Sequence, residues 1–367
     1  MSNAERVPQV AAGFAVRGEL VTTELFGRGH IHDSYALRYQ DGNSIVRYLL
    51  QRVNETVFRR PELVMANIER VTEHVRAHLL ASGAADADRR TLRLIRTHEG
   101  KSFHIADDGS YWRLYPFIEG TYVRESVETP AQAEQAGRAY GEFQRLLSDL
   151  GGPRLHETIP DFHNTPLRFE ALERAIATDP CQRVSKAEAE IDLARRHRQL
   201  AGVLLDLHRG GEIPERVVHN DAKLSNVLFD STTGEALCVV DLDTVMPGLS
   251  LYDFGDMVRS MTSRSAEDET DLAKVLLDLP LFEALARGYL QTAGEFLTPA
   301  ERRHLVTAGK LITLEQGVRF LTDFLEGDVY YRTARPGHNL DRCRTQFKLL
   351  KSLERNEAQL NRILAEL

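Results

Sequence analysis

Cysteine is scarce in this sequence, and long hydrophobic runs are absent. The 367 residues include three cysteines, which are widely separated at Cys181, Cys238 and Cys343. This spacing fits neither a disulfide scaffold nor a zinc site built from paired cysteines, and it favours a reducing compartment. No segment approaches the roughly 20 consecutive apolar residues that a transmembrane helix requires. We therefore expect a cytoplasmic protein that is not embedded in a membrane.

An excess of basic residues is also missing. Lys and Arg total 46 whereas Asp and Glu total 54, which gives a formal charge of -8, and no dense basic stripe occurs. Nucleic acid is therefore not an expected partner, because its phosphate backbone attracts basic surfaces. The first residues carry no apolar run after basic residues, so we expect no secretory signal. The composition, 42% hydrophobic and 27% charged, is typical of a soluble chain long enough for two lobes.

The first third of the chain predicts β-strands. Two β-prone runs within residues 18–39 flank a turn that contains Gly27 and Gly29, and residues 44–53 form another strand-like run. A polar turn at 107–109 separates two more runs of this kind. We therefore expect a β-rich region built from hairpins.

One amphipathic helix is predicted within this β-rich region. Apolar residues recur at three- and four-residue spacing from Val64 to Leu79. Pro61 suits the first turn of such a helix, because its missing N–H would lack an intrahelical partner there anyway.

After about residue 120 the pattern becomes helical. Helical periodicity is found in residues 130–150, 185–209, 265–293, 299–325 and 343–366. The exception is a predicted hairpin within residues 226–243, whose turn contains Gly234. We expect a β-rich lobe of residues 1–118 and a mainly helical lobe of residues 119–367.

A polar run interrupts the buried sequence after Val218. The stretch has the sequence HNDAKLSN, residues 219–226, and a buried strand cannot continue through it without leaving polar groups unpaired. The chain must therefore turn, and the turn carries the oxygen-bearing residues Asp221 and Asn226. Asp241 and Asp243 lie at the end of the next predicted hairpin, after another apolar run. Such oxygens are ligands for hard cations such as Mg²⁺.

The order His219, Asp221, Asn226 and Asp241 resembles the catalytic loop and metal-binding aspartate of the aminoglycoside phosphotransferase and choline kinase superfamily, which is related to the protein kinases. Further blocks between Gly27 and Glu354 look most similar to those of the N-acetylhexosamine 1-kinases. The resemblance implies a bilobal, protein-kinase-like α+β fold. It also implies a nucleotide-binding N-terminal lobe, a catalytic and sugar-binding C-terminal lobe, and ATP and Mg²⁺ as cofactors.

The resemblance also implies roles for individual residues. Asp221 matches the catalytic base that accepts the hydroxyl proton of the acceptor, and Asn226 and Asp241 match the metal ligands. His219 and Asp253 match residues that support the catalytic loop. The superfamily commonly has glycine where this chain has Asn220, and asparagine also tolerates unusual turn geometry.

A phosphate-binding arginine is expected where the superfamily commonly has lysine. Arg52 takes this position in the resemblance, with Arg47 as the competitor, and arginine can bind phosphate with two hydrogen bonds. The helix glutamate expected to pair with Arg52 is Glu69 or Glu73, and the sequence does not choose between them.

Other nucleotide contacts follow from the resemblance as well. The glycine-bearing turn at Gly27 and Gly29 would cover the phosphates, although such a pair is also typical of a plain hairpin turn. The connector at Pro116, Phe117 and Ile118 would meet the adenine ring, with apolar side chains against its faces.

A helix over residues 311–325 is apolar around most of its circumference but carries a charged stripe. The stripe consists of Glu315, Arg319 and Asp323 at four-residue spacing, and it is either part of an acceptor site or a solvated ladder of ion pairs. The resemblance implies sugar contacts from Arg319, Tyr330, His32, Asp33 and Asp243. Four other histidines are expected to be packing or surface residues without metal-ligand spacing: His30, His74, His104 and His338.

The sequence thus predicts an ATP-dependent kinase that phosphorylates the anomeric hydroxyl of N-acetylglucosamine or N-acetylgalactosamine. The alternative within the superfamily is a kinase for another alcohol, such as choline, an aminoglycoside or homoserine. An inactive nucleotide-binding module is a third hypothesis, which the presence of Asp221, Asn226 and Asp241 disfavours. The partners expected are ATP and a small sugar, and the sequence leaves the oligomeric state open.

Overall fold

A computed structural model describes residues 3–27 and 31–367, which form two compact units. Unit 1 contains the described residues as far as Thr121, together with Leu150–Ile159 and Leu237–Met246. Unit 2 contains Tyr122–Asp149, Pro160–Ala236 and Pro247–Leu367. The chain therefore passes between the units more than once. The lobe boundary expected at residue 118 stays a prediction.

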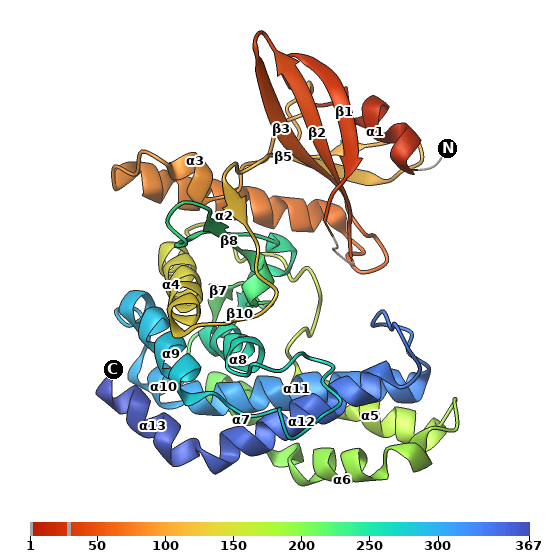
Figure 1. Ribbon diagram of the computed structural model, residues 1–367, viewed down its shortest axis with the longest axis vertical. Coiled ribbons are helices and arrows are strands. Elements are labelled where there is room, and N and C mark those ends of the chain that lie inside the picture. The colour runs from red at the N-terminus through yellow and green to blue at the C-terminus, as the bar shows by residue number, and fades with distance from the viewer. Residues whose placement is uncertain (1–2, 28–30) are drawn as a thin grey trace. The chain divides into compact units, whose positions relative to one another are not determined.

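Unit 1 is built on a five-stranded antiparallel sheet with the order β1-β2-β3-β5-β4 (Figure 1). Its strands are β1 (Glu19–Leu25), β2 (Asp33–Asp41), β3 (Ser44–Arg52), β4 (His104–Ile105) and β5 (Tyr111–Pro116). Leu37, Leu50 and Leu114 come from three neighbouring strands and share one hydrophobic core. The predicted strands are confirmed, including the pair β4 and β5 on either side of the polar turn.

Three helices accompany this sheet: α1 (Asn3–Ala11), α2 (Pro61–Ala81) and α3 (Ala87–Arg90). Helix α1 packs against the sheet, where Val7 and Val10 join the core around Trp112. The sequence pattern did not predict α1. Helix α2 begins at Pro61, as predicted, and it buries an apolar face that runs from Val64 to Leu79.

Helices are the main elements of unit 2. They are α4 (Pro130–Leu147), α5 (Thr165–Thr178), α6 (Glu188–Arg196), α7 (Val203–Arg209), α8 (Ser250–Met261), α9 (Leu279–Ala293), α10 (Pro299–Arg303), α11 (Leu305–Glu326), α12 (His338–Arg355) and α13 (Glu357–Glu366). The remaining strands, some of which lie where the chain passes between units, are β6 (Thr121–Tyr122), β7 (Arg216–Val218), β8 (Val227–Asp230), β9 (Ala236–Val239) and β10 (Met246–Gly248). Single 3-10 turns are η1 (Val184–Lys186), η2 (Arg198–Leu200), η3 (Leu224–Asn226) and η4 (Leu242–Thr244).

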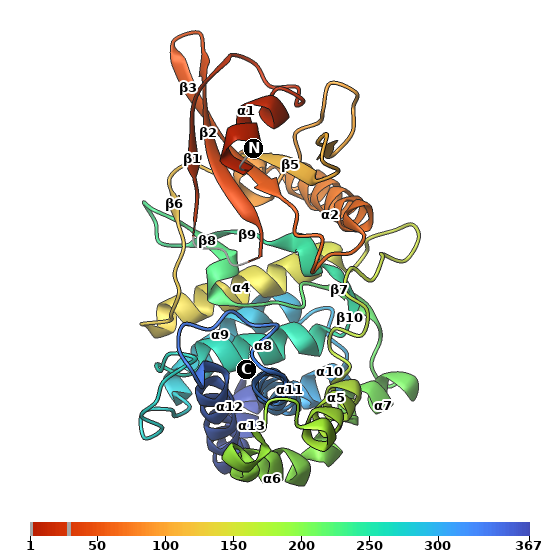
Figure 2. The ribbon, with the colours of Figure 1, turned by 90° about the vertical axis from the view of Figure 1, so that its right-hand side faces the viewer.

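Helix α11 lies at the centre of the helical packing, against α5, α8 and α12 (Figures 1 and 2). Leu314 and Leu321 of α11 share a core with Phe169 of α5 and Phe347 of α12. This burial on several sides explains why α11 is apolar around most of its circumference, as predicted.

Helices α4 and α9 form another extensive contact, and glycines allow their backbones to approach closely. A Cβ atom at Gly288 of α9 would lie 2.0 Å from the carbonyl oxygen of Glu134 in α4. At Gly137 a Cβ atom would lie 2.3 Å from the Leu285 carbonyl oxygen. Any larger residue at these two positions would push the helices apart.

The helix boundaries differ from the predictions in several places. Residues 265–278 are not helical, because Asp278 caps α9 by accepting the N–H of Leu281 and Pro280 occupies the first turn. The predicted helices over 185–209 and 299–325 are each interrupted, the second at His304. Helix α5 was not predicted.

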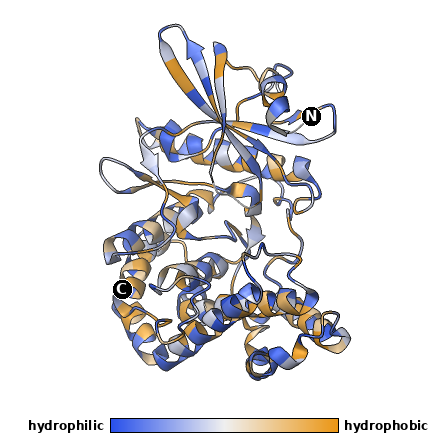
Figure 3. Cartoon of the chain, turned by 45° about the vertical axis from the view of Figure 1, so that its right-hand side comes forward, coloured by the Kyte–Doolittle hydropathy of each residue, from blue (hydrophilic) through white to orange (hydrophobic). Residues whose placement is uncertain are grey.

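Hydrophilic and hydrophobic segments alternate along the helices (Figure 3), as expected for helices with one face in a core. Among residues 3–27 and 31–367, none of the helices combines the length and the apolar character that crossing a membrane demands.

Candidate active site

The polar run at residues 219–226 forms a tight bend after β7. Asn220 has a left-handed backbone, with φ of 65°, and asparagine is one of the residues that tolerate this conformation. Asp253 of α8 holds the bend, because its carboxylate accepts the N–H groups of His219 at 2.9 Å and Asn220 at 2.6 Å. Gln144 of α4 donates to the same carboxylate at 2.7 Å. The predicted support of this loop by Asp253 is confirmed.

His219 is buried inside unit 2. Its ring makes edge contacts with the rings of Tyr140 and Phe143, both from α4. The hydroxyl of Tyr140 also donates to the carbonyl oxygen of Lys223, at 2.8 Å. Aromatic packing and hydrogen bonding together fix the path of the bend, which agrees with a supporting role for His219.

Asp221 lies partly exposed at the bend, 2.8 Å from the ammonium group of Lys223. Burial raises the pKa of the Asp221 carboxyl, but the ammonium group of Lys223 outweighs burial and holds the pKa well below its usual range. Asp221 is therefore ionised at neutral pH, and it can accept a hydrogen bond from a hydroxyl group.

Asn226 ends the η3 turn next to Asp221. Its amide nitrogen donates to the carbonyl oxygen of Asp221 at 3.0 Å and to the Asp221 carboxylate at 3.1 Å. Because the nitrogen faces Asp221, the amide oxygen is the atom that can bind a cation. The structure thus brings two of the predicted site residues together within unit 2.

Asp241 and Asp243 follow the β8–β9 hairpin and belong to unit 1. The hairpin turn is closed by a hydrogen bond from the Asp230 N–H to the Glu235 carbonyl oxygen, at 2.9 Å, which confirms the predicted turn. Asp241 has a left-handed backbone with φ of 61° and starts the η4 turn. The relative placement of Asp241 and the Asp221 bend stays a prediction.

Asp243 is buried, and Arg113 of β5 binds both of its carboxylate oxygens at 2.7 Å. Burial raises the pKa of the Asp243 carboxyl, but the charge of Arg113 outweighs it and holds the pKa far below the usual range. Gln51 of β3 accepts a further hydrogen bond from the Arg113 guanidinium. Arg113 was not predicted, although a charged residue within an otherwise buried strand was a visible signal.

His32, Asp241 and Asp243 place possible metal-ligand atoms within 4.8 Å of one another. The Nδ1 atom of His32 accepts the N–H of Asn54 at 3.1 Å, so a neutral His32 carries its hydrogen on Nε2. Nε2 lies 3.5 Å from an Asp243 carboxylate oxygen, so its hydrogen would face Asp243 and leave no lone pair there for a metal ion. Of the three residues, Asp241 fits a magnesium ion best, because Arg113 already holds Asp243.

Arg52, which is expected to bind phosphate, does not have the expected glutamate partner. Arg52 lies at the end of β3 and pairs with Asp33 of β2, with 3.5 Å between nitrogen and oxygen. Glu69 and Glu73 of α2 both pair with Arg96 instead. The predicted pairing of Arg52 with either glutamate is therefore wrong, because Arg96 supplies the positive charge beside α2.

The competing arginine, Arg47, pairs with Glu119, and its guanidinium lies 3.9 Å from the centre of the Phe117 ring. The Phe117 N–H donates to the Arg47 carbonyl oxygen at 3.0 Å, so Arg47 lies beside the connector. Phe26, just before Gly27, makes an edge contact with the Phe117 ring. Two aromatic rings thus line one side of the connector in unit 1.

The other residues that are expected to contact the nucleotide are close to these aromatic residues in the sequence. Gly27 has φ of 79°, a conformation that favours glycine, and it follows the end of β1. Gly29 and His30 lie outside the described residues. Pro116 is the last residue of β5, and Ile118 is buried.

The charged stripe of α11 is not a solvated ladder. Glu315 is buried and binds His163 and Thr165, both at the start of α5 or just before it. Asp323 is buried as well and accepts the N–H groups of residues 329–331. The ladder alternative is therefore wrong, since both carboxylates are committed to other segments of unit 2.

Arg319, between these two carboxylates, lies among aromatic rings. Its guanidinium carbon lies 5.2 Å from the ring centre of Phe162, 5.9 Å from that of Tyr330 and 5.7 Å from that of Tyr331. Burial lowers the pKa of the Arg319 guanidinium, but the charges around it, including that of Asp221, raise it above its usual value. Arg319 is thus near enough to Asp221 for their charges to interact within unit 2.

Arg168 of α5 is a second cation in this region, and the sequence pattern did not identify it. Burial first, and then the charge of Arg319, lower the pKa of the Arg168 guanidinium. It donates to the carbonyl oxygens of Asp161 and Phe162. The two guanidinium groups are therefore near enough for their charges to interact, and Arg168 also contacts the backbone of Phe162.

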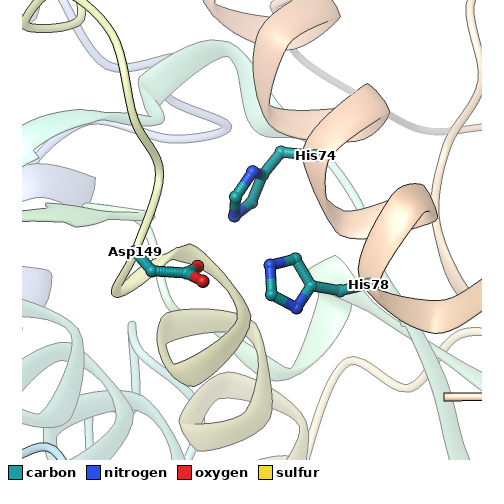
Figure 4. A group of neighbouring side chains, drawn as sticks. All are labelled: His74, His78 and Asp149. Carbon is teal, nitrogen blue, oxygen red and sulfur yellow. The ribbon is translucent and has the colours of Figure 1, made fainter. Parts of the chain in front are cut away.

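His74 and His78 lie one turn apart on α2, and their ring centres are 4.6 Å apart (Figure 4). The prediction that His74 lacks metal-ligand spacing is therefore wrong, because His78 is four residues away on the same helix and residues at this spacing are neighbours.

Comparison with known proteins shows the same fold in several kinases. A family described as the phosphotransferase enzyme family matches residues 22–305. An aminoglycoside phosphotransferase from Alicyclobacillus acidocaldarius is similar over 98% of this chain and 96% of its own, with a TM-score of 0.62 and 14% identity. A choline kinase from Cryptosporidium parvum has a TM-score of 0.60 and 11% identity, with 97% of each chain covered.

A spectinomycin phosphotransferase, solved in complex with ADP and spectinomycin, covers 97% of this chain and 98% of its own. Its TM-score is 0.55 and its identity is 13%. At such low identity these neighbours establish the fold, and the predicted kinase-like α+β fold is confirmed. The resemblance to the superfamily is confirmed as well, while the closeness to the N-acetylhexosamine kinases stays a prediction.

Proposed function

The chain belongs to the phosphotransferase enzyme family, and on that premise we propose that it transfers the γ-phosphate of ATP to the anomeric hydroxyl of an N-acetylhexosamine. The products would be ADP and the sugar 1-phosphate. We propose N-acetylglucosamine or N-acetylgalactosamine as the acceptor, and a reducing cytoplasm as the location, in keeping with the free cysteines Cys181, Cys238 and Cys343.

In this reaction Asp221 would orient the acceptor. The ionised carboxylate accepts a hydrogen bond from the anomeric hydroxyl, whose oxygen then forms a bond to the γ-phosphorus. The bond from the γ-phosphorus to its bridging oxygen breaks, ADP leaves, and the hydroxyl proton passes to Asp221. Lys223, which lies 2.8 Å from Asp221, keeps this carboxylate charged until then.

The nucleotide would be held by residues of unit 1. Arg52 would bind phosphate oxygens, and the connector at Pro116, Phe117 and Ile118 would take the adenine ring against the Phe117 ring. Gly27 and Gly29 would cover the phosphates. The spectinomycin phosphotransferase with ADP supports the choice of an adenine nucleotide.

Asn226 and Asp241 would hold magnesium, since an amide oxygen and a carboxylate are the hard ligands that this ion prefers. When bound, the ion neutralises charge on the phosphates of the nucleotide. The Asp241→Asn variant should therefore need roughly 10-fold more Mg²⁺ for half-maximal activity. Asp271→Asn, at an exposed position, is the control. An unchanged Mg²⁺ requirement in Asp241→Asn would remove that residue from the site.

The observation that carries the choice of acceptor is the position of Arg319. Aromatic faces bind cationic ligands such as choline. Here the rings of Phe162, Tyr330 and Tyr331 surround the protein's own guanidinium, with Arg168 beside it. Two guanidinium groups repel a cationic acceptor and favour hydroxyl and carbonyl oxygens, which an N-acetylated sugar offers.

The other sugar contacts are proposed at Tyr330, His32 and Asp33. Asp243 would act through His32, because Arg113 already binds both of its carboxylate oxygens. The second candidate is a kinase for choline, an aminoglycoside or homoserine. The aromatic rings around Arg319 would favour this second candidate if the guanidinium group moved away, because their faces could then bind a cationic acceptor.

An acceptor panel separates these candidates. ADP release is measured with ATP and Mg²⁺ in the presence of N-acetylglucosamine, N-acetylgalactosamine, choline, kanamycin or homoserine. We expect turnover with the two hexosamines. With the cationic acceptors, turnover should be slower by at least roughly 100-fold, because they lose about two hydrogen bonds and are repelled by the guanidinium groups. Faster turnover of choline or kanamycin would overturn the proposed acceptor and leave the family intact.

A further inference from the structure

A buried ion pair between Glu315 and His163 contacts the bend at residues 219–226. Glu315 of α11 is 1% exposed and His163, just before α5, is 8% exposed. The Nδ1 atom of His163 lies 2.8 Å from the Glu315 carboxylate, and Nε2 lies 3.0 Å from the carbonyl oxygen of Asn220. All three residues belong to unit 2.

The hydrogen-bond geometry fixes where the protons are. A carbonyl oxygen only accepts, so the Nε2 atom of His163 must carry a hydrogen and donate it to Asn220. The other oxygen of Glu315 accepts from the Thr165 hydroxyl at 2.6 Å. A proton must also lie between Nδ1 and the carboxylate, because two lone pairs would otherwise face each other. The pair therefore holds one proton more than a neutral histidine beside a carboxylate.

The surroundings favour the charged form of both partners. Burial alone would lower the pKa of His163, but the charge of Glu315 outweighs it and raises the pKa above its usual value. Burial alone would raise the pKa of Glu315, and the charges of His163 and Arg319 bring it below its usual value. Helix α8 adds the Tyr252 ring, 4.7 Å from the His163 ring, and the negative charge of Asp256.

The carbonyl group that His163 holds is part of the peptide plane that leads into Asp221. The N–H of Asn220 is fixed by Asp253, so the two sides of this left-handed residue are held from α8 and from His163. The N–H of Asp221 in the same peptide plane donates to Nδ1 of His219 at 3.3 Å, so releasing the carbonyl oxygen would leave this long hydrogen bond as the remaining restraint on the plane. The direction of the Asp221 side chain therefore depends on the His163 hydrogen bond.

We propose that His163, paired with Glu315, is a positioning residue that orients Asp221 through the carbonyl group of Asn220. The catalytic part of this inference rests on the proposed function, which makes Asp221 the proton acceptor. His163 touches neither substrate nor nucleotide in this role. Its hydrogen bond keeps the carboxylate of Asp221 directed at the acceptor hydroxyl.

The hydrogen bond from His163 to the Asn220 carbonyl oxygen, together with the pairing of His163 and Glu315, is called the clamp below. The clamp should depend on pH. The pKa of His163 is raised in the folded protein, so the stability it contributes is complete below the unfolded value of about 6.5 and is lost as pH rises through the folded value. When the proton between Nδ1 of His163 and the Glu315 carboxylate is lost, lone pairs on the two groups face and repel each other. We therefore expect kcat to fall on the alkaline side as the clamp opens.

The Glu315→Gln variant separates positioning from mere packing. A glutamine at this position can donate its amide hydrogen to Nδ1, so a neutral His163 keeps its Nε2 hydrogen on Asn220. We expect Glu315→Gln to retain most of kcat at pH 7 and to lose the alkaline fall. His163→Ala should lower kcat about 10- to 100-fold at pH 7, as removal of a group that orients a reactive residue does, and it should also lack the alkaline fall.

The matched control is His197→Gln. His197 also bonds a carbonyl oxygen, that of Leu193, and a carboxylate, that of Glu354, but it lies at the end of α6. This variant should keep both kcat and the pH profile. An alkaline fall in Glu315→Gln equal to that of the wild type would overturn the proposal, as would normal kcat in a folded His163→Ala protein.

Nitrogen-15 NMR of histidine-labelled full-length protein tests the clamp without any acceptor. We expect both ring nitrogens of His163 to be protonated in the wild type at pH 7, and Nε2 alone in Glu315→Gln. A neutral His163 ring in the wild type would overturn the inference. Should the wild type phosphorylate no acceptor, the proposed function fails, and this spectrum together with the hydrogen-exchange rate of the Asp221 amide decides the clamp by itself.

Discussion

The bend at residues 219–226 and the loop at residues 329–331, which follows α11, are held in different ways, although both belong to unit 2. At the bend, groups from several elements bind backbone atoms of residues 219, 220 and 223: Asp253, His163 and Tyr140. At residues 329–331, three consecutive N–H groups bind the single carboxylate of Asp323. Val329 and Tyr330 are 74% and 58% exposed there.

Under the proposed function, this difference would separate the residues that carry out phosphoryl transfer from those that select the acceptor. The bend cannot change its shape without losing several buried hydrogen bonds, so Asp221 is presented in one way. In the loop, one carboxylate binds the backbone of residues 329–331 and the Tyr331 ring packs against Phe320, whereas the exposed side chains of Val329 and Tyr330 can vary with little cost to the core. A family with one reaction and many acceptors is expected to be built in this manner.

The largest effect is expected at the bend itself. Asp221→Asn removes the carboxylate that accepts the proton, and kcat should fall about 10²- to 10⁴-fold, the usual contribution of a general base. The midpoint of thermal unfolding should change little, because Asp221 is partly exposed. Steady-state kinetics and calorimetry check both points. A variant with wild-type turnover would remove Asp221 from the mechanism.

Asp253→Asn tests how firmly the bend is held. An asparagine has one acceptor oxygen for the two N–H groups of His219 and Asn220, so a buried donor loses its partner at a cost of about 1–3 kcal/mol. We expect a lower unfolding midpoint in urea together with a reduced kcat. An exposed aspartate, Asp206, provides the control Asp206→Asn. Unchanged stability in Asp253→Asn would show that the bend keeps its shape without this anchor.

The loop should respond differently, with binding affected more than turnover. Asp323→Asn weakens the hold on residues 329–331, so KM for the sugar should rise about 10-fold, as for one lost hydrogen bond to a charged group. The KM for ATP should not move. Glu326→Gln, at an exposed position on the same helix, is the control. An equal loss of kcat in Asp323→Asn would mean that the two regions are not separate.

The smallest effect is expected from Lys223→Gln. Lys223 lowers the pKa of Asp221, so its removal should raise that pKa and move the acid limb of the kcat profile to higher pH. A carboxyl group with a lowered pKa stabilises the fold above its unfolded value of about 3.9, and this stability is lost as pH falls through the folded value. Acid unfolding should therefore begin at higher pH in Lys223→Gln than in the control Lys351→Gln. An unmoved acid limb would contradict the ion pair.

The sequence was most informative where local pattern decides the structure. The spacing of apolar residues predicted α2, and Pro61 predicted where this helix begins. The turn residues predicted the β-hairpins. The polar run after Val218 predicted the bend, because a buried strand could not contain it. These features depend on residues close together in the chain.

The parts that were missed depend on contacts between distant residues. His163 and Glu315 are 152 positions apart, so no local period reveals that they form a buried pair. Arg113 and Asp243 are 130 positions apart, and Arg96 replaced Arg52 as the partner of the α2 glutamates for the same reason. Helix α5 was missed although its N-cap, Asn164, and the following Pro166 were visible signals.

The most direct test of the central claim uses N-acetylglucosamine labelled with carbon-13 at C1, incubated with the enzyme, ATP and Mg²⁺. Transfer to the anomeric oxygen would split the C1 signal by coupling to phosphorus, and the account predicts this splitting in the wild type and its absence with Asp221→Asn. A product with phosphorus on another oxygen, or an unsplit C1 signal after ATP has been consumed, would contradict it.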